Sequence, residues 1–143
     1  MISSKKTFFI SMLLSMSLII IVFSSCSSDD SNDEVIIMPT LSYKGSFVSA
    51  VHPTSGMVTI NNAKTKLAFT SFMSDNGPNL DVYLVSDINN VNADFINLGD
   101  LKGLSGSHSY DLPTDINYAV YKHVVIWCSD FDVNFGYATL SKQ

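Results

Sequence analysis

Apolar and polar residues alternate in short runs from Leu41 to the end of the chain, and this pattern constrains the fold more than any other feature. No window in this stretch shows the 3.6-residue apolar period of an amphipathic helix. Successive side chains of a β-strand point to opposite faces, so runs of alternating character predict half-buried strands. The predicted strands span residues 43–51, 56–61, 66–72, 80–85, 95–98, 108–112, 118–128 and 133–140.

Turn-forming residues separate these predicted strands. Asn, Asp, Gly and Pro gather at 53–56, 75–78 and 113–115, where they supply positive φ, a fixed φ or a side chain that bonds its own backbone. The segment 86–94 is expected to be a loop or a short helical turn. About eight short strands in some hundred residues predict an all-β fold, either a single antiparallel β-sandwich or a partly open barrel. A chain of 143 residues has room for one such domain.

Strand parity predicts which side chains are buried. Leu80, Val82 and Leu84 fall on one face of their strand. Val124, Ile126 and Cys128 likewise share one face of another strand, so both sets are expected to meet in the core.

The N-terminal segment has the three parts of an export signal. Lys5 and Lys6 precede an apolar stretch that runs to Phe23, and a short polar segment leads to Cys26. That stretch is shorter than the roughly 20 apolar residues of a membrane span. The residues before Cys26 resemble a bacterial lipobox, so residues 1–25 are predicted to be a lipoprotein signal peptide and Cys26 the acylated first residue of the mature protein. An ordinary cleaved secretory signal is the alternative.

Residues 26–40 are predicted to be an acidic tether between the lipid and the domain at 41–143. Their acidic run, 29–34, cannot bury itself and should be solvated. The serine after Cys26 resembles the pattern of lipoproteins sent to the outer membrane, and the acidic run resembles surface-export signals. We therefore expect a protein anchored to the outer membrane through acylated Cys26, on its periplasmic or its cell-surface face. Two or more acyl chains hold a protein on a bilayer without a spanning helix.

Charge argues against nucleic acid as a partner. The chain has eight basic residues against thirteen acidic ones, a formal net charge of −5, and a phosphate-binding surface needs the opposite balance.

Cys128 is the only thiol that remains if Cys26 is acylated. An unpaired cysteine in an exported protein has three explanations. It is a small buried apolar residue, a redox or cofactor-ligating thiol, or half of an intermolecular disulfide.

Several short motifs, in order, resemble the DM-thirteen domain, a family described as electron transfer. They include the segment 77–84, the segment 110–113, His52, and the Trp127-Cys128 pair followed by the aromatic residues of 131–138. The resemblance covers about residues 43–141. It implies a β-rich domain in which Cys128 acts in redox chemistry, as a bare thiol or as a ligand to a prosthetic group. His52 and Trp127 become candidate supporting residues for binding.

Other chemistry has weaker support in the sequence. The Cys-x-x-Cys-His motif of covalent haem attachment is absent. A non-covalent haem would need an axial ligand, such as Cys128, one of the histidines His52, His108 and His123, or one of the methionines Met38, Met57 and Met73. No motif predicts a metal site or a hydrolase, so a stand-alone enzyme is not expected. Two functions stay open: electron transfer through Cys128 with a redox or envelope protein partner, and a non-catalytic envelope module that binds a protein or glycan and keeps Cys128 as packing.

Overall fold

The computed structural model describes residues 41–143, which form one antiparallel sheet with no α-helix. The predicted signal peptide, the acidic tether and Cys26 lie outside the described residues. The elements in chain order are β1 (Leu41–Ser49), β2 (Thr54–Asn61), β3 (Lys66–Ser74), β4 (Leu80–Val85), the 3₁₀ turn η1 (Val91–Ala93), β5 (Phe95–Asp100), β6 (Ser105–Asp111), β7 (His123–Cys128), β8 (Val133–Thr139) and β9 (Ser141–Lys142). Within this part of the chain no helix is long and apolar enough to be a membrane span.

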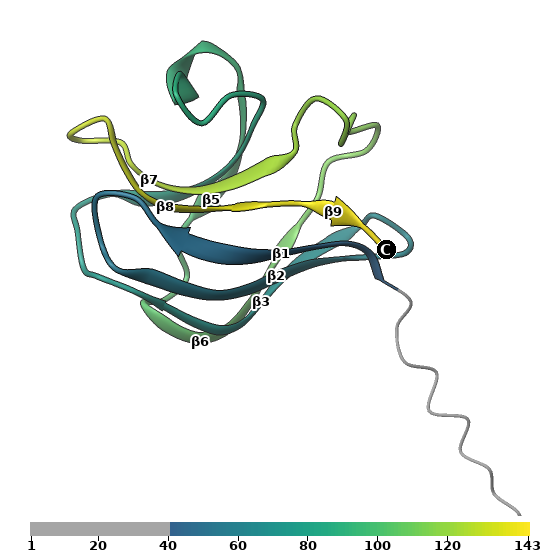
Figure 1. Ribbon diagram of the computed structural model, residues 1–143, viewed down its shortest axis with the longest axis horizontal. Coiled ribbons are helices and arrows are strands. Elements are labelled where there is room, and N and C mark those ends of the chain that lie inside the picture. The colour runs from purple at the N-terminus through teal and green to yellow at the C-terminus, as the bar shows by residue number, and fades with distance from the viewer. Residues whose placement is uncertain (1–40) are drawn as a thin grey trace, which may run out of the picture. The chain divides into compact units, whose positions relative to one another are not determined.

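The strand order is β5-β4-β7-β8-β1-β2-β3-β6, with β9 paired to β1, and the sheet curls until it nearly closes into a barrel (Figure 1). Five strand pairs contain register shifts, which increase local twist and let a sheet bend. At one shift Gly56 has a φ of +114°, and a Cβ there would lie 2.7 Å from Cα of Phe72. The predicted all-β fold is therefore confirmed, and of its two predicted forms the structure has the partly open barrel.

The predicted strands differ from the observed ones mainly at their ends. The strand predicted at 118–128 begins only at His123, because the preceding residues form a turn: the backbone amide of Tyr121 donates to the carbonyl of Asn117 over 2.9 Å. The amide of Ala119 donates to the Asn117 side chain over 3.1 Å, which stabilises this turn. The short strand β9 was not predicted. The helical turn considered within 86–94 is present as η1.

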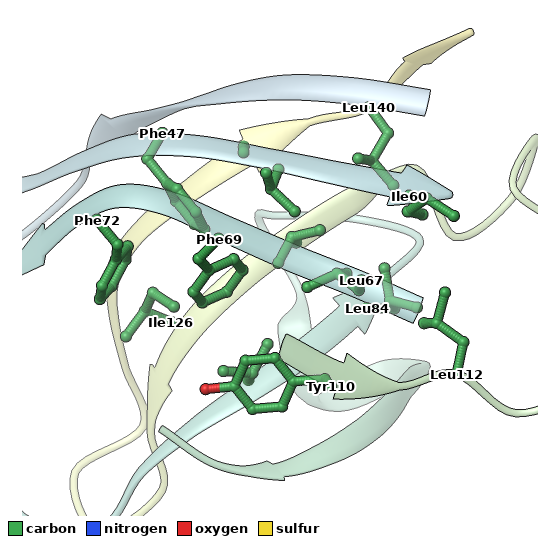
Figure 2. Packing of buried hydrophobic residues seen from close by; sticks show 14 of the residues in the cluster. Phe47, Ile60, Leu67, Phe69, Phe72, Leu84, Tyr110, Leu112, Ile126 and Leu140 are labelled. Atoms are coloured by element: carbon green, nitrogen blue, oxygen red, sulfur yellow. The ribbon is translucent and has the colours of Figure 1, made fainter. Parts of the chain in front are cut away.

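The barrel interior holds one apolar core, to which both predicted faces contribute. Leu80, Val82 and Leu84 lie directly opposite Cys128, Ile126 and Val124 in the pairing of β4 with β7. Aromatic rings from the other half of the sheet meet them (Figure 2). The ring of Phe69, for example, lies 5.0 Å from Phe47 and 5.3 Å from Tyr110 between centroids. The parity prediction is confirmed.

The antiparallel order gives the barrel two distinct ends. The proximal end holds the start of β1 and the C-terminus, because β9 pairs with Tyr43 and Lys44. The distal end holds the loops 50–53, 75–79, 101–104 and 129–132, and these lie on the opposite side from the C-terminus in Figure 1.

Candidate functional site: a thiol pocket at the distal end

A pocket of about 500 Å³ opens at the distal end of the barrel. This volume is within the range of small-molecule sites. Three of the distal loops, the end of β7 and the start of β8 supply its walls, and most of the lining is apolar. The lining residues are His52, Asn76, Gly77, Pro78, Cys128, Phe131, Val133 and Phe135.

Cys128 places its sulfur between the core and this pocket. It is the last residue of β7 and belongs to the core cluster, with only 1% of its surface exposed. Its thiol donates a hydrogen bond to the carbonyl of Pro78 over 3.0 Å. It is a free cysteine, and the only cysteine among residues 41–143. The thiol is therefore buried and also part of a pocket wall.

His52 lines the same pocket from the loop between β1 and β2. The backbone amide of His52 donates to the carbonyl of Phe135 over 3.2 Å, and its ring stacks on the Phe135 ring with 3.9 Å between centroids. Nδ1 of His52 lies 3.3 Å from a carboxylate oxygen of Asp75. Contacts on both sides fix the orientation of the imidazole. The structure thus brings together His52 and Cys128, two residues that are 76 positions apart in the sequence.

Two further residues shape the pocket. A Cβ on Gly77 would lie 2.5 Å from Cζ of Phe135, so only glycine lets the β3–β4 loop pack this closely against the ring. Phe131, in the β7–β8 loop, is 69% exposed although it also lines the pocket. Because so much of its ring is exposed, Phe131 lies at the mouth of the pocket and not in its floor.

Trp127 lies on the opposite face of the sheet from Cys128. Adjacent residues of a strand point in opposite directions, and Trp127 packs outside the barrel interior in a second cluster with Tyr83, Val85, Val91 and Val125. Its ring is 6.5 Å from that of Tyr83. Burial, reinforced by Asp81, raises the pKa of Tyr83 above its ordinary value. The structure therefore does not bring Trp127 to the thiol pocket.

The other histidines lie away from this pocket. His108 sits on β6, with Nε2 3.0 Å from the carbonyl of Ser105. His123 opens β7 at the proximal end, where Nδ1 lies 2.9 Å from the hydroxyl of Thr139 and burial lowers the pKa of the imidazole. In the part of the chain that the structure describes, no three His, Cys, Asp or Glu side chains are grouped to hold a metal ion.

A haem bound through Cys128 does not fit this arrangement. An axial thiolate must meet the iron, whereas the Cys128 sulfur is 1% exposed and engaged with the Pro78 carbonyl. The pocket lining also contains no lysine or arginine to pair with the haem propionates. No haem-mediated step follows from this geometry, and the chemistry that the pocket offers is that of a thiol and an imidazole in the wall of one apolar pocket.

Sequence reasoning did not place Asp75, Pro78 or Val133 at a thiol site. The run from Asp75 to Pro78 was assigned to a turn, because Asp-Asn-Gly-Pro is turn chemistry wherever it occurs. Their place beside His52 and Cys128 depends on how β3, β4 and β7 end at the same rim.

Fold and site define the class of this protein: a small, nearly closed antiparallel barrel with one buried thiol at the wall of an apolar end pocket. The sequence profile of the family described as Electron transfer DM13 matches residues 46–140, about two-thirds of the chain. The chain belongs to the DM13 family, as the resemblance had predicted. No curated protein and no solved structure matches the chain.

Proposed function

We propose that this protein is a membrane-anchored extracytoplasmic lipoprotein whose DM13 domain transfers electrons through the Cys128 thiol. The family description supports an electron-transfer role. The observation that carries the finer proposal is the position of Cys128, whose sulfur borders a pocket that also receives His52. The lipobox-like residues around Cys26 support the anchor, and the residues after it support an outer-membrane location at the periplasmic or cell-surface face.

A single thiol can pass electrons by exchange with disulfide-bearing proteins. The Cys128 sulfur, after losing its proton, attacks a disulfide of an acceptor protein. The acceptor S–S bond breaks, its leaving sulfur takes up a proton, and a mixed disulfide with Cys128 forms. One thiol of a donor dithiol then attacks the Cys128 sulfur and releases the acceptor as a dithiol. The second donor thiol closes the donor disulfide and restores the Cys128 thiol. Two electrons and two protons pass from donor to acceptor.

Access to the sulfur tests this proposal. In the full Cys26→Ala chain, where Cys128 is the only thiol, the rate of reaction with a small aromatic disulfide is measured from 0 M urea up to the start of unfolding. We expect a rate that hardly depends on urea, because an opening confined to the pocket exposes little surface. If the sulfur were reached only through complete unfolding, the rate would instead rise with urea as steeply as the unfolding equilibrium does. That result would refute the redox proposal.

That second result would favour a non-catalytic envelope module that binds a protein or glycan partner. Its specific support is the burial of Cys128, which is 1% exposed and belongs to the core cluster. Buried free cysteines act as small apolar residues and are inert. In that case the apolar pocket, and not the thiol, would be the functional feature.

The anchor has its own test. Radiolabelled palmitate is expected to enter the wild-type protein in bacterial cells and to be absent from Cys26→Ala, because the acyl chains are attached at that residue. The Cys128→Ala chain, which keeps Cys26, is the matched control and should be labelled like the wild type. Equal labelling of wild type and Cys26→Ala would refute acylation at Cys26.

A further inference from the structure

Exposed apolar side chains gather at the distal end of the barrel. Seven large apolar side chains are exposed in the part of the chain that the structure describes, and four of them belong to this end. They are Val51 (68% exposed), Met73 (62%), Leu104 (38%) and Phe131 (69%). They come from the loops and strand ends of the distal end, and Phe131 also lines the thiol pocket. Apolar side chains that cluster on one surface, rimmed by polar residues, mark interaction sites.

Charge is divided between the two ends. The loops and strand ends of the distal end carry five aspartates, Asp75, Asp81, Asp100, Asp130 and Asp132, against the single lysine Lys102, a net charge of −4. Nζ of Lys102 is turned back onto β6, over the ring of Tyr110 at 4.8 Å from its centroid. The proximal end holds the five other described lysines, Lys44, Lys64, Lys66, Lys122 and Lys142, against four aspartates.

We infer that the distal end is a docking surface for a basic protein partner that inserts an apolar side chain into the pocket. This rests on the proposed function, whose disulfide-bearing partner must come to the Cys128 sulfur through the same opening. The five aspartates of the distal end, here called the acidic rim, would attract positive charge on the partner and steer its approach. The apolar mouth, with Phe131 at its edge, would supply the contacts that hold the partner in place.

A protein partner fits the distal end better than a lipid surface does. An anionic membrane surface does not suit an acidic rim.

A short peptide provides the test. The full chain, in non-ionic detergent, is titrated into a fluorescein-labelled peptide with two lysines on each side of one tryptophan, and anisotropy is recorded. We expect binding that weakens as salt is raised from about 0.05 to 0.5 M, because rim charges are screened. Phe131→Ala should weaken binding about tenfold, and Asp130→Asn with Asp132→Asn about threefold.

Matched variants at the proximal end are the controls. Val120→Ala removes an exposed apolar side chain and Asp115→Asn removes an exposed charge, and both should bind as the wild type does. The inference is overturned if the peptide fails to bind, if Phe131→Ala binds it equally well, or if glutamates in place of its lysines leave binding intact. It is also overturned if light scattering shows oligomers of the chain that Phe131→Ala dissociates, because the occupant is then a second copy.

The peptide contains no sulfur, so its binding does not report on the chemistry of Cys128. If the peptide binds but the thiol reacts only on global unfolding, the docking surface is supported and the proposed electron transfer is refuted. If the thiol reacts in the folded chain but the peptide does not bind, the docking surface is refuted and the proposed electron transfer is supported.

Discussion

Replacing Trp127 by alanine is expected to lower the free energy of unfolding by about 3–5 kcal/mol, the usual cost of removing a large buried aromatic ring. The side chain is 7% exposed and packs with Tyr83 and Val125 on the face of the sheet away from the pocket. Because it does not touch the thiol pocket, the reactivity of Cys128 in the folded chain should stay within about twofold of the wild-type rate.

Urea unfolding followed by circular dichroism measures the first quantity, and the reaction of Cys128 with an aromatic disulfide at low urea measures the second. Both are done in the Cys26→Ala chain. A thiol rate that rises by the same factor as the unfolding equilibrium constant would mean that Cys128 is reached only by global unfolding. A changed rate with unchanged stability would mean that Trp127 supports the thiol directly, against the position that the structure gives it.

Much of the fold could be predicted because alternation records which face of a strand is buried. The strand predicted at 80–85 has the observed bounds, since a fully apolar face ends at a turn on either side. The predicted strand ends were wrong where contacts between strands determine them. The β6 strand starts at Ser105, three residues before its predicted start, and its first residues are small and polar. These residues extend the strand only because β3 is there to pair with them, Met73 opposite Ser105 and Phe72 opposite Gly106.

The candidate site could be predicted only in part. Cys128 stood out because it is the one thiol in the domain, and the family resemblance added His52, but no local pattern places these two residues in one pocket. Their proximity follows from β8 lying between β1 and β7, with Phe135 of β8 stacked on His52. For Trp127, the sequence suggested a place at the site that the structure does not confirm. Its adjacency to Cys128 in the sequence suggested a supporting role, yet the same alternation that predicts the core also puts neighbouring side chains on opposite faces.

Phe135→Ala is expected to cost a similar 3–5 kcal/mol of unfolding free energy, but to change the pocket as well. Phe135 is 4% exposed, its ring is the stacking partner of His52, and the Gly77 backbone packs directly against it. Without the ring, the imidazole loses one of the contacts that orient it and the wall beside Cys128 opens. The rate at which Cys128 reacts at low urea should therefore rise by about tenfold or more, with little dependence on urea.

The comparison of Phe135→Ala with Trp127→Ala separates pocket access from stability, because the two variants lose about the same free energy of unfolding on opposite faces of the sheet. Circular dichroism checks that the losses match, and the aromatic disulfide reports the thiol. A selective acceleration in Phe135→Ala means that the sulfur is reached through the distal pocket, which is the route that a redox partner would use. Equal acceleration in both variants means that Cys128 is exposed only when the barrel comes apart, and it would refute the proposed electron transfer through this thiol.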